Sequence, residues 1–150
     1  MEVTREILAK ARERAQQIGL SYAGALLPAE SYTLMQNLAE AKLVDVRTRA
    51  ELEWVGRVPD SVCIEWNTWP GGGRNPDFLA EFEAQIARNA IVMFLCRSGV
   101  RSHHAAIAVT RAGYANAYNV LEGFEGDKDP SGKRNRLGGW RFAGLPWVQG

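Results

Sequence analysis

Hydrophobic and polar positions divide the chain into short apolar runs and longer stretches with helical periodicity. Between residues 4 and 18, apolar side chains recur at the spacing of one helix face, and Arg, Glu and Lys fill the positions between them. Gly19 is placed to end that helix. A second helix is predicted from Pro28 to about Glu40.

Shorter apolar runs later in the chain alternate with helical segments. Strands are predicted at residues 43–46, 62–65, 91–95 and 117–121. Helical segments are predicted at 50–54, 77–86 and 102–112, and the Gly-rich stretch 67–76 is predicted to be a loop. This alternation indicates an α/β fold with a mainly parallel central sheet flanked by helices. The continuous apolar run 91–95 is typical of the central strand of such a sheet.

The central apolar run ends in Cys96, and a short loop rich in Arg, Ser and Gly follows it. A strand, a tight loop and a helix form an anion pocket, because backbone N–H groups turn inward and the helix N-terminus adds positive potential. Such a pocket favours the thiolate form of a cysteine at its mouth. A cysteine after an apolar strand is more often a small buried hydrophobe. Here Arg97, Gly99 and Arg101 lie within five positions of it, which favours a nucleophile.

The stretch Cys96-Arg97-Ser98-Gly99-Val100-Arg101-Ser102 resembles the active-site loop of rhodanese-type sulfurtransferases. Other segments resemble further regions of the same family, in the same order along the chain. They are the Asp-Val-Arg segment 43–52 with the following 56–62, the segment 113–123, and the closing Gly-Leu-Pro-Trp at 144–147. The resemblance covers residues 30–148. It implies a single rhodanese-like domain over 1–150, with residues 1–28 as an N-terminal helical extension.

The resemblance also implies a function and a site. A thiolate at Cys96, the expected catalytic residue, would take a sulfane sulfur from thiosulfate or a related persulfide donor and become a persulfide. The sulfur would then pass to cyanide, a thiol or a sulfur-accepting protein, in a two-step covalent mechanism. No cofactor and no metal are implied, and Asp45 and Arg47 are expected to form a structural ion pair. The expected substrate-binding residues are Arg97, Ser98, Gly99, Val100, Arg101 and Ser102.

Three other functions fit parts of the same pattern. Phosphatases and arsenate reductases of similar fold also place a cysteine before an anion loop that ends in arginine. Only four residues separate Cys96 from Arg101, one fewer than in those enzymes, and the smaller ring suits a single sulfur atom better than a phosphate. A rhodanese module used only for docking often lacks the cysteine, whereas a persulfide carrier would use Cys96 in the same way.

The composition of the chain indicates which partners and which cellular compartment to expect. A net charge of +1 gives no electrostatic footprint for nucleic acid. The two cysteines, Cys63 and Cys96, form no disulfide framework and no zinc-ligand spacing. No apolar run approaches the roughly 18 residues of a membrane span, and the first residues contain no apolar signal core. A cytoplasmic location without membrane contact is therefore expected.

Several residues outside the loop carry secondary expectations. Cys63 lies in a predicted strand and is expected to be a core residue. Trp66 and Trp69 flank the Gly-rich loop, where ordinary packing is the default role and forming a wall of the pocket is the alternative. The long polar segment 122–141 follows the last predicted strand, so it either borders the site or is a solvated loop.

Overall fold

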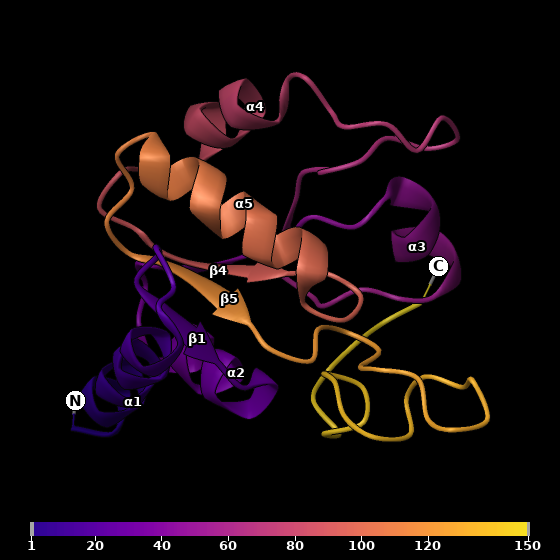
Figure 1. The fold of residues 1–150 in the computed structure, drawn as a ribbon, viewed down its shortest axis with the longest axis horizontal. Helices are drawn as coiled ribbons and strands as arrows, with labels where there is room; N and C mark the ends of the chain where they lie inside the picture. Colours follow the sequence, from indigo (N-terminus) through magenta and orange to yellow (C-terminus); the bar gives the residue numbers. More distant parts are fainter. Residues whose placement is uncertain (1, 150) are drawn as a thin grey trace.

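The computed structural model describes residues 2–149 and contains a five-stranded sheet in which every neighbouring pair of strands is parallel (Figure 1). In chain order the strands are β1 (Gly24–Leu26), β2 (Ala41–Asp45), β3 (Val62–Cys63), β4 (Ile91–Leu95) and β5 (Ala117–Val120). Their order across the sheet is β1-β5-β4-β2-β3, which places β4 at the centre. The α/β fold with a parallel central sheet is therefore confirmed.

Helices cover both faces of this sheet. They are α1 (Glu2–Ile18), α2 (Pro28–Asn37), α3 (Arg49–Trp54), α4 (Phe78–Gln85) and α5 (Val100–Arg111). Each overlaps a helical segment that the sequence predicts. The sequence does not predict β1, because a run of three residues is too short to show a period. Its Gly24 lies against α1, where an added Cβ would come within 2.8 Å of the Ala11 carbonyl group.

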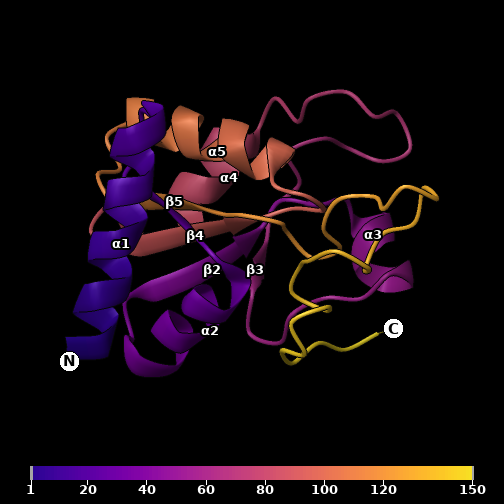
Figure 2. The same cartoon turned by 60° about the horizontal axis from the view of Figure 1, so that its bottom comes forward.

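The continuous apolar sequence of β4 reflects burial on both faces of the sheet. Val92 and Phe94 belong to one hydrophobic cluster, which also contains the buried side chains of α4 and α5. Met93 and Leu95 belong to the other, which contains Ala11 of α1 and Leu34 of α2. In Figure 2, α4 and α5 lie above the strands and α2 lies below them, and in Figure 1 α1 lies on the same side of the strands as α2. Successive side chains of a strand point to opposite faces, so a strand covered twice carries no polar alternation.

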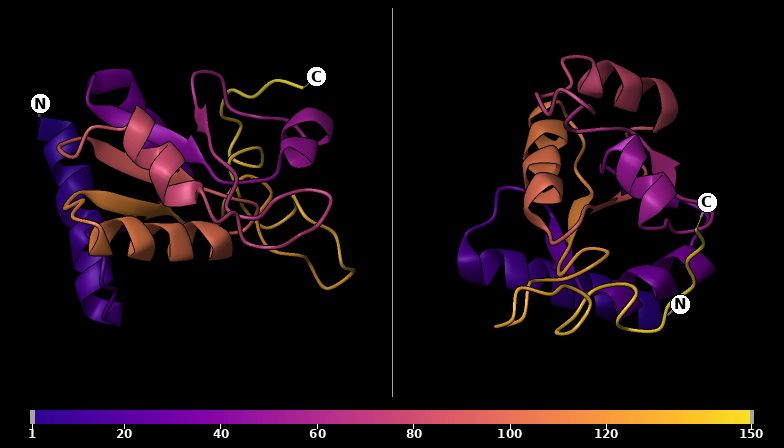
Figure 3. Two further views of the ribbon diagram at one scale, coloured as in Figure 1. Left: turned by 90° about the horizontal axis from the view of Figure 1, so that it is seen from above. Right: turned by 90° about the vertical axis from the view of Figure 1, so that its right-hand side faces the viewer.

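The carboxyl ends of the strands point toward α3 and the C-terminal segment, residues 141–149, at the end of the molecule opposite α1 (Figure 3). Val148 pairs with Arg57 through two backbone hydrogen bonds, of 2.8 and 2.9 Å. The ring of Trp147 lies over Gly56, where a Cβ would come within 2.7 Å of it. Within residues 2–149, no helix combines the length and apolar character needed to cross a membrane.

The expectation that Cys63 is a core residue is wrong. Its side chain is exposed, and its Sγ lies 3.9 Å from the Ser61 hydroxyl oxygen. The physical reason is the position of β3, which is a two-residue strand at the edge of the sheet. The apolar residue that enters the core from this segment is the next one, Ile64.

Candidate functional site

Cys96 directly follows the central strand β4, and only 1% of its surface is exposed. The Gly99 N–H donates to its Sγ at 3.1 Å, and the Ser102 Oγ lies 3.2 Å from the same sulfur. Gly99 has φ 107°, a left-handed conformation open to glycine, and helix α5 begins at the next residue. The expected strand, tight loop and helix are therefore present, with the sulfur facing the start of α5.

Ser102 is tied to a residue that sequence reasoning missed. Its Oγ donates to the Asn119 Oδ1 at 2.6 Å, and the Asn119 Nδ2 donates to the Gly99 carbonyl oxygen at 3.2 Å. The second bond fixes the orientation of the Asn119 amide. Because a hydroxyl has one proton, Ser102 then faces Cys96 as an acceptor, which suits a thiol. To donate to a thiolate or a persulfide, the Ser102 hydroxyl must rotate away from Asn119.

The segment after β5 encloses the backbone of the Cys96 loop. The Phe124 N–H donates to the Cys96 carbonyl oxygen at 2.8 Å, and the Glu125 N–H donates to the Arg97 carbonyl oxygen at 3.0 Å. Gly123 has φ 66°, and a Cβ there would lie 2.5 Å from the Arg97 carbonyl carbon and 2.6 Å from the Cys96 carbonyl oxygen. Only glycine allows this close approach, so the Gly123 backbone holds the loop from outside.

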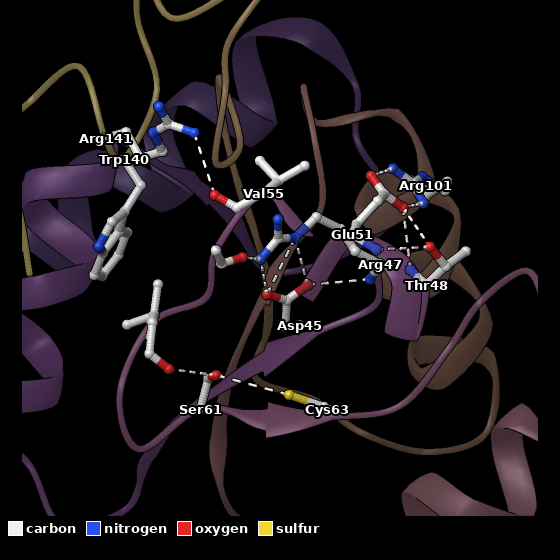
Figure 4. Close-up of polar contacts among 12 residues, drawn as sticks. Asp45, Arg47, Thr48, Glu51, Val55, Ser61, Cys63, Arg101, Trp140 and Arg141 are labelled. Atoms are coloured by element: carbon white, nitrogen blue, oxygen red, sulfur yellow. Dashed lines mark hydrogen bonds and ion pairs between the residues drawn. The ribbon is translucent and has the colours of Figure 1, made fainter. Parts of the chain in front are cut away.

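Arg101 is paired with a carboxylate from α3 (Figure 4). Its two terminal nitrogens donate to the two carboxylate oxygens of Glu51, at 2.7 and 2.9 Å. Glu51 also accepts hydrogen bonds from the N–H and the hydroxyl of Thr48, each at 3.1 Å. Burial opposes ionisation of this carboxyl, but the bonds from Arg101 and Thr48 outweigh it and lower the Glu51 pKa to about 2. The pairing raises the Arg101 pKa in spite of burial.

A pocket of about 900 Å³, the Cys96 pocket, opens in front of Cys96. Of the predicted site residues, it is lined by Cys96, Arg97, Ser98, Val100 and Arg101. Gly99 and Ser102 do not line it but contact the Cys96 sulfur. The structure therefore brings the whole predicted set together at the Cys96 sulfur and the pocket in front of it.

The two tryptophans that flank the Gly-rich loop have different roles, and the 122–141 segment lies beside the site. Trp66 is buried and lies beneath the Arg74 guanidinium, 3.6 Å from its ring centre, so its role is packing. Trp69 instead lines the Cys96 pocket. Glu125 and Arg134 of the 122–141 segment also line it, so this segment borders the site.

The expected ion pair between Asp45 and Arg47 lies beneath the loops at this end of the sheet (Figure 4). Both side chains are fully buried, and the Arg47 Nη2 donates to Asp45 Oδ2 and to the Gly56 carbonyl oxygen, each at 2.8 Å. The same guanidinium lies 4.2 Å from the ring centre of Phe124. One buried cation thus connects the end of β2, the turn after α3 and the segment that encloses Cys96.

Comparison with known proteins assigns the chain to a family. The family model of the rhodanese-like domain matches residues 28–129, which is more than half of the chain. The chain belongs to the rhodanese-like family. This confirms the resemblance expected from the sequence.

Individual proteins also resemble the chain over most of its length. The crystal structure of Rv0390 from M. tuberculosis is 47% identical, has a TM-score of 0.78, and its match covers 87% of this chain and 100% of that one. The uncharacterized protein RC0915 of Rickettsia conorii is 37% identical over 122 residues, covering 79% of this chain and 91% of that protein. A sulfurtransferase of Allochromatium vinosum is 30% identical over 97 residues, covering 63% and 80%. Family membership and this relative support a sulfurtransferase-type activity at the level of the family.

Proposed function

We propose that this protein is a sulfurtransferase that carries a sulfane sulfur as a persulfide on Cys96. The observation that carries the proposal is the setting of the Cys96 sulfur. It lies at the Cys96 pocket, accepts the Gly99 N–H at 3.1 Å, and faces the start of α5. The pocket gives a donor access to the sulfur, and the N–H group and the helix N-terminus stabilise the negative charge that both the thiolate and the persulfide carry.

The proposed reaction has two covalent steps. With thiosulfate as donor, the Cys96 thiolate attacks the outer sulfur, a new S–S bond forms, and the donor's S–S bond breaks. Sulfite leaves with the electron pair of that bond. Cyanide, a thiol or a sulfur-accepting protein then attacks the outer sulfur of the persulfide, and Cys96 departs as a thiolate. Neither step needs an external oxidant or reductant.

The cations of the pocket have different roles in this proposal. Glu51 neutralises most of the charge of Arg101, so this arginine shapes the loop rather than offering a free cation to the donor. Arg97 is exposed and lines the pocket, and Arg134 lines it from the 122–141 segment. We assign the attraction of an anionic donor to these two side chains.

The same pairing argues against a phosphatase. A phosphatase with a cysteine nucleophile needs the arginine at the end of its loop to bind the phosphoryl oxygens in bidentate fashion. Here both terminal nitrogens of Arg101 are engaged by Glu51, and only four residues separate Arg101 from Cys96. We expect hydrolysis of an aryl phosphate to remain at background.

The deciding experiment compares Cys96→Ser with Cys63→Ser. Cys63 is the matched control, because it is the other cysteine and is exposed outside the Cys96 pocket. After incubation with thiosulfate, intact mass should increase by one sulfur atom in the wild type and in Cys63→Ser, but not in Cys96→Ser. Thermal unfolding should show that both variants remain folded. Sulfur addition to Cys96→Ser, or its absence from the wild type with a free thiol, would refute the proposal.

A further inference from the structure

Two tryptophan side chains are exposed in the Cys96 pocket. Trp54 is 69% exposed at the end of α3, and Trp69 is 58% exposed in the loop between β3 and α4. Both line the same pocket as Cys96, together with Val100, which is 63% exposed. Neither indole contributes much to the core, so folding alone does not account for their placement. Exposed apolar surface gathered in one concavity is typical of a ligand-binding site.

The backbone that carries Trp54 is held in place by the C-terminal segment. The Gln149 side-chain amide donates to the Trp54 carbonyl oxygen at 3.0 Å. The Arg141 guanidinium donates to the next carbonyl oxygen, that of Val55, at 3.3 Å (Figure 4). These bonds occupy carbonyl groups at the end of α3 that the helix itself leaves free. Trp54 therefore sits on a fixed support although its ring faces water.

The loop that carries Trp69 is closed in a similar way. Asn67 and Arg74 form an antiparallel bridge at its base. Above the bridge, the Thr68 N–H donates to the Gly73 carbonyl oxygen at 2.9 Å, and the Gly72 N–H donates to the Thr68 carbonyl oxygen at 2.7 Å. The backbone that carries each tryptophan is thus held in place before a ligand arrives, which lowers the entropy that binding would otherwise cost.

The size and charge of the pocket indicate what it binds. A volume of about 900 Å³ is in the range that organic ligands occupy, whereas thiosulfate is a compact inorganic dianion that leaves both indoles in water. Besides Arg101, which is paired with Glu51, the cations that line the pocket are Arg97 and Arg134. The Arg134 Nη1 donates to the Gly126 carbonyl oxygen at 2.7 Å, a neutral partner that leaves the charge of this guanidinium uncompensated. The pocket therefore combines apolar walls with a limited positive charge near the nucleophile.

We propose that the physiological donor is an organic sulfane-sulfur anion whose apolar, aromatic-sized body packs against Trp54 and Trp69. This inference rests on the proposed function and names the substrate class for the same site. For an organic thiosulfonate, the Cys96 thiolate attacks the terminal sulfur and the bond between that sulfur and the sulfonyl sulfur breaks. The sulfinate leaves with the electron pair, and the Cys96 persulfide remains.

Benzenethiosulfonate and methanethiosulfonate test this directly, because they share one reactive group and differ only in the organic body. We expect kcat/KM for the wild type to favour the benzene compound by about tenfold or more, since pockets discriminate by that factor for a single well-packed apolar group. Trp54→Ala and Trp69→Ala should each lower this preference several-fold. Trp69→Phe should retain most of it. Phe142→Ala is the matched control, because Phe142 is 54% exposed but does not line the pocket, and it should keep the wild-type ratio.

Persulfide formation, followed by intact mass, separates the two proposals. If thiosulfate and both thiosulfonates load Cys96 but the wild type shows no preference for the benzene compound, the substrate class is wrong and the sulfurtransferase proposal stands. A preference that survives in both tryptophan-to-alanine variants also refutes the assigned walls. If no donor loads Cys96, the function itself is wrong. Thermal unfolding of each variant verifies that the altered ratio does not come from a misfolded protein.

Discussion

Replacing Glu51 by Gln removes the charge that holds Arg101 while keeping the size of the side chain. In the native protein, Glu51 accepts two bonds from Arg101 and two from Thr48. Glutamine can still accept from Thr48, but its amide group would present N–H donors to a guanidinium. Arg101, whose side chain is 19% exposed, would then lose its counter-charge at a site where water replaces it poorly. We expect Glu51→Gln to destabilise the fold.

The size of this loss follows from the depressed pKa of Glu51. A fall from 4.5 to about 2 corresponds to about 3 kcal/mol of preferential stabilisation of the charged form in the folded state. Solvent reaches both partners, each 19% exposed, and screening reduces the net value to about 1–2 kcal/mol. Because the folded-state pKa lies below the unfolded-state value, this stability is present above about pH 4.5. It is lost as the pH falls toward 2.

Urea unfolding of the wild type and of Glu51→Gln at a series of pH values measures this contribution. The difference in free energy of unfolding should be about 1–2 kcal/mol at pH 7 and should shrink steadily below pH 4.5. Glu83→Gln is the matched control, because Glu83 pairs with Arg88 at the surface, with side chains 38% and 59% exposed. It should cost less than about 0.5 kcal/mol. A Glu51→Gln difference that does not change with pH would show that lost packing, not charge pairing, is responsible.

Three further predictions concern the loop around Cys96. Gly123→Ala should destabilise the protein by about 2 kcal/mol or more and reduce persulfide formation, because its Cβ would overlap the Arg97 backbone. Gly132→Ala, with a similar positive φ but open space, should cost less in the same unfolding assay. Asn119→Ala should raise the rate of Cys96 alkylation at pH 7 by roughly tenfold, because the Ser102 proton becomes free to bond to the thiolate. If the alkylation rate stays raised in the double variant Asn119→Ala/Ser102→Ala, this explanation is wrong. Arg101→Ala should lower kcat/KM for thiosulfate about ten- to hundredfold, since it leaves Glu51 unpaired beside an anionic donor, and an unchanged value would rule out that role.

The parts of the site that sequence predicts are those that lie close together along the chain. The apolar run of β4, Cys96 and the start of α5 are contiguous in the sequence. The hydrophobic pattern and the composition of the loop are therefore enough to predict them. Glu51 and Arg101 are 50 positions apart, and Ser102 and Asn119 are 17 apart. Nothing in a single sequence couples such pairs, because the contact exists only once neighbouring strands have set the register of the sheet.

The register between β4 and β5 explains why Asn119 lies next to the Cys96 loop. Asn119 of β5 pairs with Phe94 of β4. Phe94 lies two positions before Cys96, near the end of β4 where the Cys96 loop begins. A polar side chain buried at this point would be costly without partners, and Asn119 is only 4% exposed. Its carbonyl oxygen accepts from Ser102 and its amide donates to the Gly99 carbonyl oxygen, so both ends of the side chain are used. This polar residue of β5 therefore acts on the Cys96 sulfur indirectly, because it accepts the Ser102 proton that could otherwise be donated to that sulfur.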